Sequence, residues 1–188
     1  MKNVSLYIDL CSSYCIIGLY EKQKLIDYLI VPTKNNLTDL VNELIFNLLA
    51  KHQLSITDHL QAIYMNNGPG SFTGLRVSGI IAKTLNALYQ VDLYTADHLK
   101  LLSYNQKDAL VFLDAKGDKL YAYYHQTYHV ILKSEKTATI EQIPYSQLLE
   151  INEQTFDYES FLKNLPFALF DLQTDWSALD LNYVKKPV

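Results

Sequence analysis

The first third of the chain carries apolar residues in short runs that are rich in β-forming side chains. One run spans Val4–Leu10, and a second, Cys15–Tyr20, follows after a few polar residues. A third run, Leu25–Val31, stops at Pro32, which has no N–H group to offer a β-ladder. The pattern predicts a β-hairpin followed by a third strand.

Apolar residues then recur at helical spacing, and Asn35 or Asn36 stands where an N-cap is expected. The predicted helix places its apolar residues on one face: Leu37, Leu40, Val41, Leu44, Ile45, Leu48 and Leu49. Phe46 falls on the polar side of this helix. Single exposed apolar residues are common on protein surfaces, so Phe46 is either such a residue at the edge of the helix or a contact for a partner protein.

A strand, a glycine-rich turn and a second helix come next. The strand is expected at Ala62–Asn66, the turn at Asn67–Gly74 and the helix from Leu75 to about Tyr89. A strand at Val91–Tyr94 and a short helix at Ala96–Tyr104 complete the order β-β-β-α-β-α-β-α. This order predicts one α/β lobe over residues 1–105.

The remaining residues, 106–188, repeat the start of this scheme in a shorter form. Strands are predicted at Leu110–Leu113, Leu120–Tyr124 and Val130–Leu132, and the first of them ends in Asp114 as the first strand of the chain ends at Asp9. The shared scheme of strand, aspartate, turn and returning strand indicates an internal duplication. The rest is predicted as two short helices, a strand and a polar tail: Tyr145–Ile151, Phe156–Leu165, Phe167–Phe170 and Trp176–Val188.

The turn Gly68-Pro69-Gly70 has the residue types of a type II turn, in which proline sets φ and the next glycine accepts a positive φ. Ser71 or Thr73 is expected to cap the helix that follows. The first N–H groups of a helix attract anions or carboxylates. The turn therefore either ends a strand and caps a helix or also binds such a group.

Arg76 is the single arginine of the chain and lies beside this turn. Its planar guanidinium suggests a bidentate contact that lysine would not reproduce. Asp9 and Asp114 occupy equivalent strand ends, where a nucleotide-handling protein would hold a magnesium phosphate between its lobes. The first hairpin has no glycine in its turn, and both aspartates are alternatively turn caps.

The second helix has apolar residues around much of its circumference, which is typical of a helix that is covered on most sides. Gly74, Ser78 and Ala82 stand four apart and form a stripe along which another helix can approach closely. The stripe packs either against the Leu37–Leu49 helix of the same chain or, together with it, against a partner protein.

Composition narrows the function classes. The 188 residues are 49% hydrophobic with a net charge of −4 and no cluster of basic residues, which argues against autonomous nucleic-acid binding. We expect no membrane partner and a soluble, cytoplasmic protein, because the sequence offers neither a signal peptide nor an apolar stretch of about 20 residues. Two cysteines give no disulfide framework, and His125 and His129 lack further ligands, so no metal site is expected.

The segment Asn67–Val77 reads Asn-Gly-Pro-Gly-Ser-Phe-Thr-Gly-Leu-Arg-Val and resembles the signature of the bacterial TsaB (YeaZ) family. Support comes from Ile8-Asp9, from Phe112–Ala115 and from the closing Leu181–Val184. The similarity covers residues 1 to about 128. It departs from the family at residues 33–36, where members commonly have a histidine and a serine.

The resemblance implies an actin-like (ASKHA, ribonuclease H-like) α/β fold of duplicated βββαβα lobes with the second lobe shortened. It implies a non-catalytic subunit that binds a TsaD-like transferase and supports tRNA threonylcarbamoyladenosine formation at position 37 of ANN-decoding tRNAs. The resemblance further implies that a TsaE-like ATPase joins the two proteins, that the subunit forms a homodimer when alone, and that tRNA binds only to the complex. The implied partner interface comprises Leu37, Leu40, Val41, Leu44, Phe46, Gly74, Leu75, Ser78 and Ala82.

No cofactor is expected within the chain, but ATP or ADP is a candidate ligand at the boundary with the transferase. The candidate nucleotide or anion contacts are Asp9, Gly68, Gly70, Ser71, Thr73 and Arg76. The alternative function is an ATP-dependent small-molecule kinase or ATPase of the actin-like superfold, which needs a pair of phosphate loops. A metallopeptidase is a third reading, and it needs a zinc-binding helix.

Overall fold

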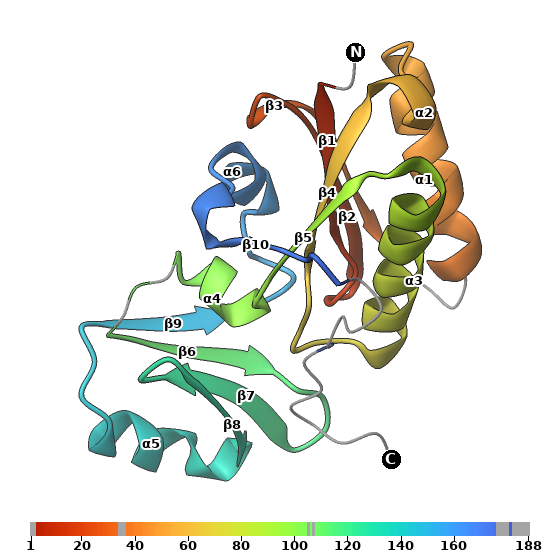
Figure 1. The fold of residues 1–188 in the computed structure, drawn as a ribbon. Coiled ribbons are helices and arrows are strands. Elements are labelled where there is room, and N and C mark those ends of the chain that lie inside the picture. Colours follow the sequence, from red (N-terminus) through yellow and green to blue (C-terminus); the bar gives the residue numbers. More distant parts are fainter. Residues whose placement is uncertain (1–2, 34–36, 105, 107, 176–180, 182–188) are drawn as a thin grey trace.

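The computed structural model describes residues 3–33, 37–104, 106, 108–175 and 181. The chain forms two β-sheets (Figure 1). Their outer sides carry α1 (Leu37–Lys51), α3 (Phe72–Tyr89) and α5 (Lys136–Gln142), and the inner side of the first sheet carries α4 (His98–Leu102) and α6 (Tyr158–Lys163). The first sheet has the strand order β10-β5-β4-β1-β2-β3. Its strands are β1 (Val4–Asp9), β2 (Tyr14–Glu21), β3 (Lys24–Pro32), β4 (Leu60–Asn66), β5 (Asp92–Ala96) and β10 (Asp171–Leu172).

The predicted hairpin and third strand are confirmed, because β1 pairs with β2 and β2 with β3, both antiparallel. The next two strands join in parallel, β4 beside β1 and β5 beside β4. A parallel pair needs a long crossover connection, and helices supply it here. They are α1 (Leu37–Lys51), α2 (Ile56–His59) and α3 (Phe72–Tyr89).

Helices α1 and α3 cover one face of the first sheet (Figure 1). Their apolar sides pack on β1, β2 and β4 in one buried cluster, in which Val41, Ala82 and Ile63 are at most 1% exposed. The short helix α2, which the sequence pattern did not predict, is capped by the Ser55 hydroxyl and adds Ile56 to this cluster.

The second sheet repeats the strand order of the first, with β8-β7-β6-β9 in place of β3-β2-β1-β4. Its strands are β6 (Ala109–Asp114), β7 (Lys119–Tyr124), β8 (Thr127–Leu132) and β9 (Gln147–Ile151). The 3-10 helix η1 (Lys133–Glu135) and helix α5 (Lys136–Gln142) stand where α1 stands in the first lobe. The predicted duplication is therefore confirmed by topology.

The two lobes also share a turn conformation. Lys22 and Gln23 join β2 to β3 with φ of 49° and 65°, and His125 and Gln126 join β7 to β8 with φ of 48° and 59°. Positive φ at both central residues is what a type I′ hairpin turn requires. The left-handed backbone is uncommon for such residues, so its recurrence at equivalent turns supports the duplication.

Two predictions for the second lobe are wrong. Tyr145–Ile151 is not a helix, because Gln147–Ile151 forms β9, parallel to β6. Phe167–Phe170 is not a strand, because Phe167–Leu169 forms the 3-10 helix η2 and β10 follows it. Short apolar runs do not distinguish helix from strand, and pairing with a distant strand decided both cases.

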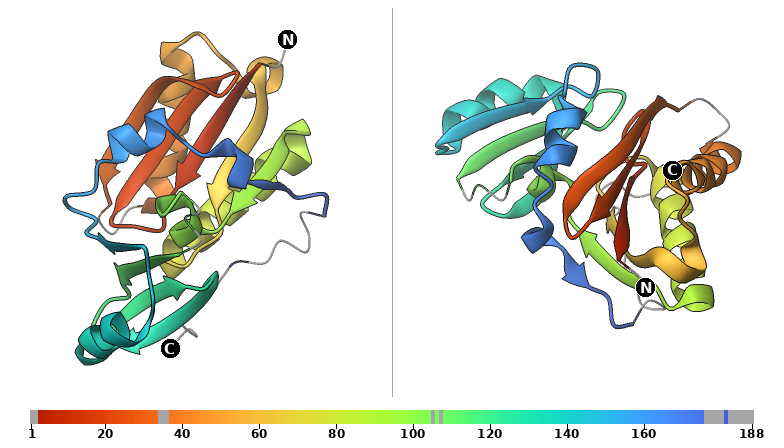
Figure 2. Two further views of the ribbon diagram at one scale, coloured as in Figure 1. Left: turned by 90° about the vertical axis from the view of Figure 1, so that its left-hand side faces the viewer. Right: turned by 90° about the horizontal axis from the view of Figure 1, so that it is seen from above.

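The chain returns to the first sheet after β9. Helix α6 (Tyr158–Lys163), predicted within Phe156–Leu165, lies with η2 against the face opposite α1 and α3 (Figure 2). The Tyr20 hydroxyl donates a hydrogen bond of 2.8 Å to the Leu162 carbonyl there. Helix α4 (His98–Leu102) joins the same apolar cluster. Residues 158–172 thus help to bury the first sheet, and a lobe boundary at residue 105 stays a prediction.

The predicted tail at residues 176–188 lies outside the described residues except for Leu181, which packs on the cluster beneath α3. Within the described part of the chain, no helix combines the length and apolar character that a bilayer span requires.

Candidate functional site

The glycine-rich turn after β4 lets the start of α3 approach the loop between β1 and β2. A Cβ atom added at Gly70 would lie 2.5 Å from Cys11 Cβ, and one at Gly74 would lie 1.7 Å from the Leu10 carbonyl oxygen. The Ser71 N–H donates a hydrogen bond of 2.8 Å to the Cys11 carbonyl. The bare backbone is therefore needed for contact within the chain.

The turn differs from the predicted type II conformation. Gly68 has the positive φ, 105°, and Gly70 does not, so the glycine after Pro69 is required by the close approach to Cys11 rather than by a left-handed backbone. Ser71 caps α3, since its hydroxyl accepts a hydrogen bond of 3.2 Å from the Gly74 N–H. Thr73, the other candidate cap, is exposed in the first turn.

The stripe of small residues on α3 is not open to another helix, and this corrects the expected partner interface. Gly74, Leu75, Ser78 and Ala82 are all buried against their own chain. The Ser78 hydroxyl donates within the helix, to the Gly74 carbonyl at 3.0 Å and the Leu75 carbonyl at 3.1 Å. Gly74 packs on β1 because its missing side chain admits the Leu10 carbonyl.

The α1 residues of the predicted interface differ from one another in burial. Val41 is fully buried, Leu40 and Leu44 are half-buried, and Leu44 packs against the core. Leu37 begins α1, but its side chain lies outside the described residues. Phe46 is 59% exposed, which makes it the one predicted α1 residue that projects into solvent among those the structure describes.

Phe46 lies beside exposed residues of α3 that the sequence reading had not assigned to a partner. Ile80 is 65% exposed and Leu88 is 68% exposed. Between the two helices runs a groove of about 330 Å³, and we call this groove with Phe46, Ile80 and Leu88 the α1–α3 face. The groove is lined by Asn42, Ile45, Phe46, Ile56, Ile80, Ile81, Thr84, Leu85, Leu88 and Tyr89. A contiguous apolar surface of this kind is typical of a protein contact.

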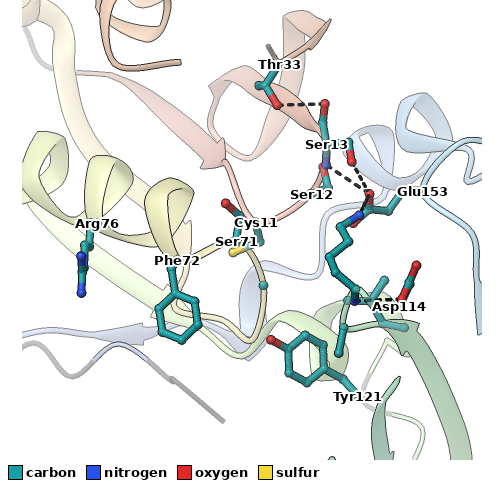
Figure 3. A pocket seen from close by; sticks show the side chains of 14 residues that line it. Cys11, Ser12, Ser13, Thr33, Ser71, Phe72, Arg76, Asp114, Tyr121 and Glu153 are labelled. Carbon is teal, nitrogen blue, oxygen red and sulfur yellow. Dashed lines mark hydrogen bonds and ion pairs between the residues drawn. The ribbon is translucent and has the colours of Figure 1, made fainter. Parts of the chain in front are cut away.

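A second hollow, of about 600 Å³, lies between the two lobes at the ends of β1 and β6 (Figure 3). Ser71, Phe72 and Arg76 reach it from the start of α3, and Tyr121 reaches it from β7. We call this hollow the interlobe cleft. Its lining comprises Cys11, Ser12, Ser13, Thr33, Gly70, Ser71, Phe72, Arg76, Leu113, Asp114, Ala115, Lys116, Tyr121 and Glu153.

Asp9, a predicted nucleotide contact, is not among these lining residues and is only 1% exposed. Its carboxylate accepts a hydrogen bond of 2.8 Å from the Cys11 N–H and one of 3.4 Å from the Tyr7 hydroxyl. His98 Nε2 lies 3.7 Å from the same carboxylate. The sequence reading missed His98, because only the fold brings the start of α4 beneath β1.

His98 is 2% exposed, and its Nδ1 lies 2.9 Å from the Pro69 carbonyl. Because a carbonyl only accepts hydrogen bonds, Nδ1 carries a proton. Burial raises the pKa of the Cys11 thiol well above its usual value, and the charge of Asp9 adds to the effect. The thiol donates to the Asn66 side-chain oxygen. A thiol in these surroundings is a poor nucleophile, since the reactive thiolate is disfavoured.

Of the remaining predicted residues, Asp114 lines the interlobe cleft with Gly70, Ser71 and Arg76, whereas His125 and His129 do not line it. Asp114 is exposed at the end of β6 and pairs with Lys133 at 3.2 Å. His125 and His129 lie in the β7–β8 hairpin, where His129 stacks on the Tyr124 ring. Over the described ranges, no group of three or more histidine, cysteine, aspartate or glutamate side chains is placed to hold a metal ion.

A family model described as TsaD, tRNA N6-adenosine threonylcarbamoyltransferase, matches residues 30–179. The tRNA threonylcarbamoyladenosine biosynthesis protein TsaB of Buchnera aphidicola (subspecies Schizaphis graminum) is 27% identical over 150 residues, which cover 76% of this chain and 70% of the relative. The chain belongs to this family, in its TsaB (YeaZ) branch. A relative from Mycoplasma genitalium, the uncharacterized protein MG208, is 28% identical over 87% of this chain and 84% of its own length.

Solved structures of YeaZ-like proteins have the same fold. A Pseudomonas aeruginosa protein described as similar to peptidase YEAZ matches 98% of this chain and all of its own chain, with a TM-score of 0.66 and 17% identity. YeaZ from Pseudomonas aeruginosa matches 79% of this chain and 84% of its own, with a TM-score of 0.56 and 18% identity. The predicted α/β fold of duplicated lobes with a shorter second lobe is confirmed by the strand order of the two sheets, and the YeaZ-like structures share this fold.

Proposed function

We propose that this chain is a non-catalytic subunit that binds a TsaD-like transferase and supports threonylcarbamoyladenosine formation at position 37 of ANN-decoding tRNAs. The family supports the pathway, since curated relatives are named as TsaB proteins of tRNA threonylcarbamoyladenosine biosynthesis. A supporting role is favoured over catalysis because the Asp9 carboxylate is held in a buried network apart from the interlobe cleft.

The observation that carries the proposal is the α1–α3 face. Phe46, Ile80 and Leu88 together expose large apolar side chains on two adjacent helices, at 59%, 65% and 68% of their surface. Burying such side chains contributes about 25 cal/mol per Å² of apolar area. The transferase, or a second copy of the chain when the transferase is absent, covers this face.

Other components join through the same complex. We propose that a TsaE-like ATPase binds the pair, that tRNA is met only there, and that the assembly works in the cytoplasm. We also propose that ATP or ADP binds at the boundary with the transferase. Arg76 is its candidate contact, because this exposed residue of α3 lines the interlobe cleft one helical turn after Phe72.

Light scattering after size-exclusion chromatography tests the proposal, with the chain alone and mixed with the TsaD-like protein of the same source, with and without ATP. Wild type is expected to form a heteromeric complex, and Ile80→Glu is expected to lose it. Ile26→Glu is the matched control, because Ile26 is also exposed, at 41%, but belongs to the edge strand β3. An unchanged complex with Ile80→Glu contradicts the proposed surface.

Failure of wild type to associate at micromolar concentration contradicts the subunit role itself. The kinase or ATPase reading is tested in parallel by ATP turnover. Turnover by the chain alone that disappears in Asp9→Asn would replace the proposed function with that alternative.

A further inference from the structure

Glu153 reaches from the second lobe to the first across the interlobe cleft (Figure 3). It follows β9, and its carboxylate accepts a hydrogen bond of 2.7 Å from the Ser13 hydroxyl and one of 3.2 Å from the Ser13 N–H. The Lys116 ammonium, from the β6–β7 turn, lies 3.4 Å from the same oxygen. Three donors therefore converge on one carboxylate oxygen.

The first-lobe part of this donor set is held in position by its neighbours. Ser13 lies in the loop between β1 and β2, and its carbonyl accepts hydrogen bonds from the Thr33 N–H at 2.8 Å and the Thr33 hydroxyl at 3.0 Å. In the same loop, the Cys11 carbonyl accepts a hydrogen bond from the Ser71 N–H. The Ser13 N–H and hydroxyl are thus presented to the cleft by the end of β3 and the start of α3.

The Glu153 side chain is 11% exposed, whereas that of Lys116 is 68% exposed. A mostly buried carboxylate is stabilised by hydrogen bonds to its oxygens, and Ser13, although itself an exposed residue, donates two of them. A backbone N–H, a hydroxyl and an ammonium are also the groups that bind a free oxyanion such as phosphate.

We propose that Ser13 and Lys116 form an oxyanion subsite that the chain fills with its own Glu153. In this arrangement Glu153 fastens the second lobe to the β1–β2 loop. It also keeps phosphate-like anions out of the Ser13–Lys116 subsite, which is one part of the interlobe cleft. This inference is independent of any partner of the α1–α3 face.

Titration of the ¹⁵N-labelled full chain with inorganic phosphate, at constant ionic strength, tests the subsite. In wild type the Ser13 amide resonance is expected to stay unchanged at millimolar phosphate. In Glu153→Ala it is expected to shift and saturate, and Glu153→Ala with Lys116→Ala is expected to lose most of that response. Amide hydrogen exchange at Ser13 is expected to become faster by roughly tenfold in Glu153→Ala without phosphate.

Glu150→Ala is the matched control, because Glu150 lies on β9, pairs with Lys136 and does not line the interlobe cleft. An equal phosphate response of Ser13 in wild type and Glu153→Ala overturns the proposal, as does the absence of a response in Glu153→Ala. Shifts confined to surface lysines indicate an adventitious ion only and also overturn it. If Glu153→Ala does not fold, Glu153→Gln retains the side-chain size, and unchanged Ser13 exchange in that variant contradicts the role of the charge.

Discussion

Asp9 and Asp114 make the same local hydrogen bond in the two lobes. Each carboxylate accepts a hydrogen bond from the backbone N–H two residues later, Asp9 from Cys11 at 2.8 Å and Asp114 from Lys116 at 2.9 Å. Each therefore closes the turn at the end of the first strand of its lobe. The two carboxylates differ in solvent exposure, since Asp9 is 1% exposed and Asp114 lies at the surface.

Gly74→Ala is expected to destabilise the protein by about 2–3 kcal/mol, the cost of overpacking a rigid contact. The added Cβ would lie 1.7 Å from the Leu10 carbonyl oxygen. Relieving this clash requires a shift of the α3 backbone or of the backbone after β1, because the contact is to a main-chain atom and not to a flexible side chain. Gly79→Ala in the same helix is the control, because its Cβ would meet Leu181 only at 3.5 Å. Urea unfolding followed by circular dichroism measures both, and Gly79→Ala is expected to be neutral or stabilising since alanine favours helix. Equal effects of the two substitutions would contradict the close approach.

Substitution of Phe46, Ile80 and Leu88 by serine is expected to separate association from stability. Each side chain is more than half exposed in the single chain, and surface substitutions usually change the unfolding free energy by less than about 0.5 kcal/mol. The triple variant should therefore unfold at nearly the same urea concentration as wild type at low protein concentration, yet fail to bind the transferase. A large loss of stability in the isolated chain would show that these residues belong to its core.

Asp27 is expected to stabilise the fold in a pH-dependent way. It accepts hydrogen bonds from Lys51 at 2.6 Å and His52 at 2.8 Å, and these, with Lys51 the larger cause, lower the pKa of Asp27 to about 2. A carboxyl group whose pKa is lower in the folded protein stabilises the fold at any pH above its pKa in the unfolded chain, which is near 4. This stabilisation is lost as the pH falls through the folded-state pKa of about 2.

The measurement is the difference in unfolding free energy between wild type and Asp27→Asn along a pH series. We expect about 1 kcal/mol at neutral pH, a modest value because the Lys51 side chain is 67% exposed. The difference should shrink between about pH 4 and pH 2. Glu43→Gln, at an exposed position of α1, serves as control. A difference for Asp27→Asn that is independent of pH would exclude the charge as its source.

Both cysteines are expected to be unreactive in the folded protein. Burial raises the pKa of the Cys15 thiol to about 12, with a smaller contribution from Asp9, and burial also raises that of Cys11. The thiolate is the reactive form, so Ellman's reagent should label neither thiol at mildly alkaline pH in native conditions and both in guanidinium chloride. Rapid labelling of the native protein would contradict the closed packing around Cys11 at the cleft.

Local patterns were sufficient for much of this fold. Strand runs stopped by Pro32 and the helical spacing after Leu37 predicted β1 to β3 and α1, and the turn residues before α3 predicted its Ser71 cap. These features depend on neighbours within a few residues. Phe46 was also identifiable as an outward aromatic residue, since a helix fixes which side chains share a face.

The sequence alone therefore determined the order of the elements from β1 to α4 except for the short α2, the duplicated scheme, and the two helices that border the α1–α3 face. Tertiary structure decided which face of α3 is buried, that Gln147–Ile151 pairs as β9, and that Glu153 meets Ser13 from 140 residues away. The periodicity of the sequence shows that one face of a helix or strand carries apolar or small side chains, but it does not show which segment packs against that face. Covering contacts depend on the distance between segments in space, which the spacing of residues along the chain does not encode.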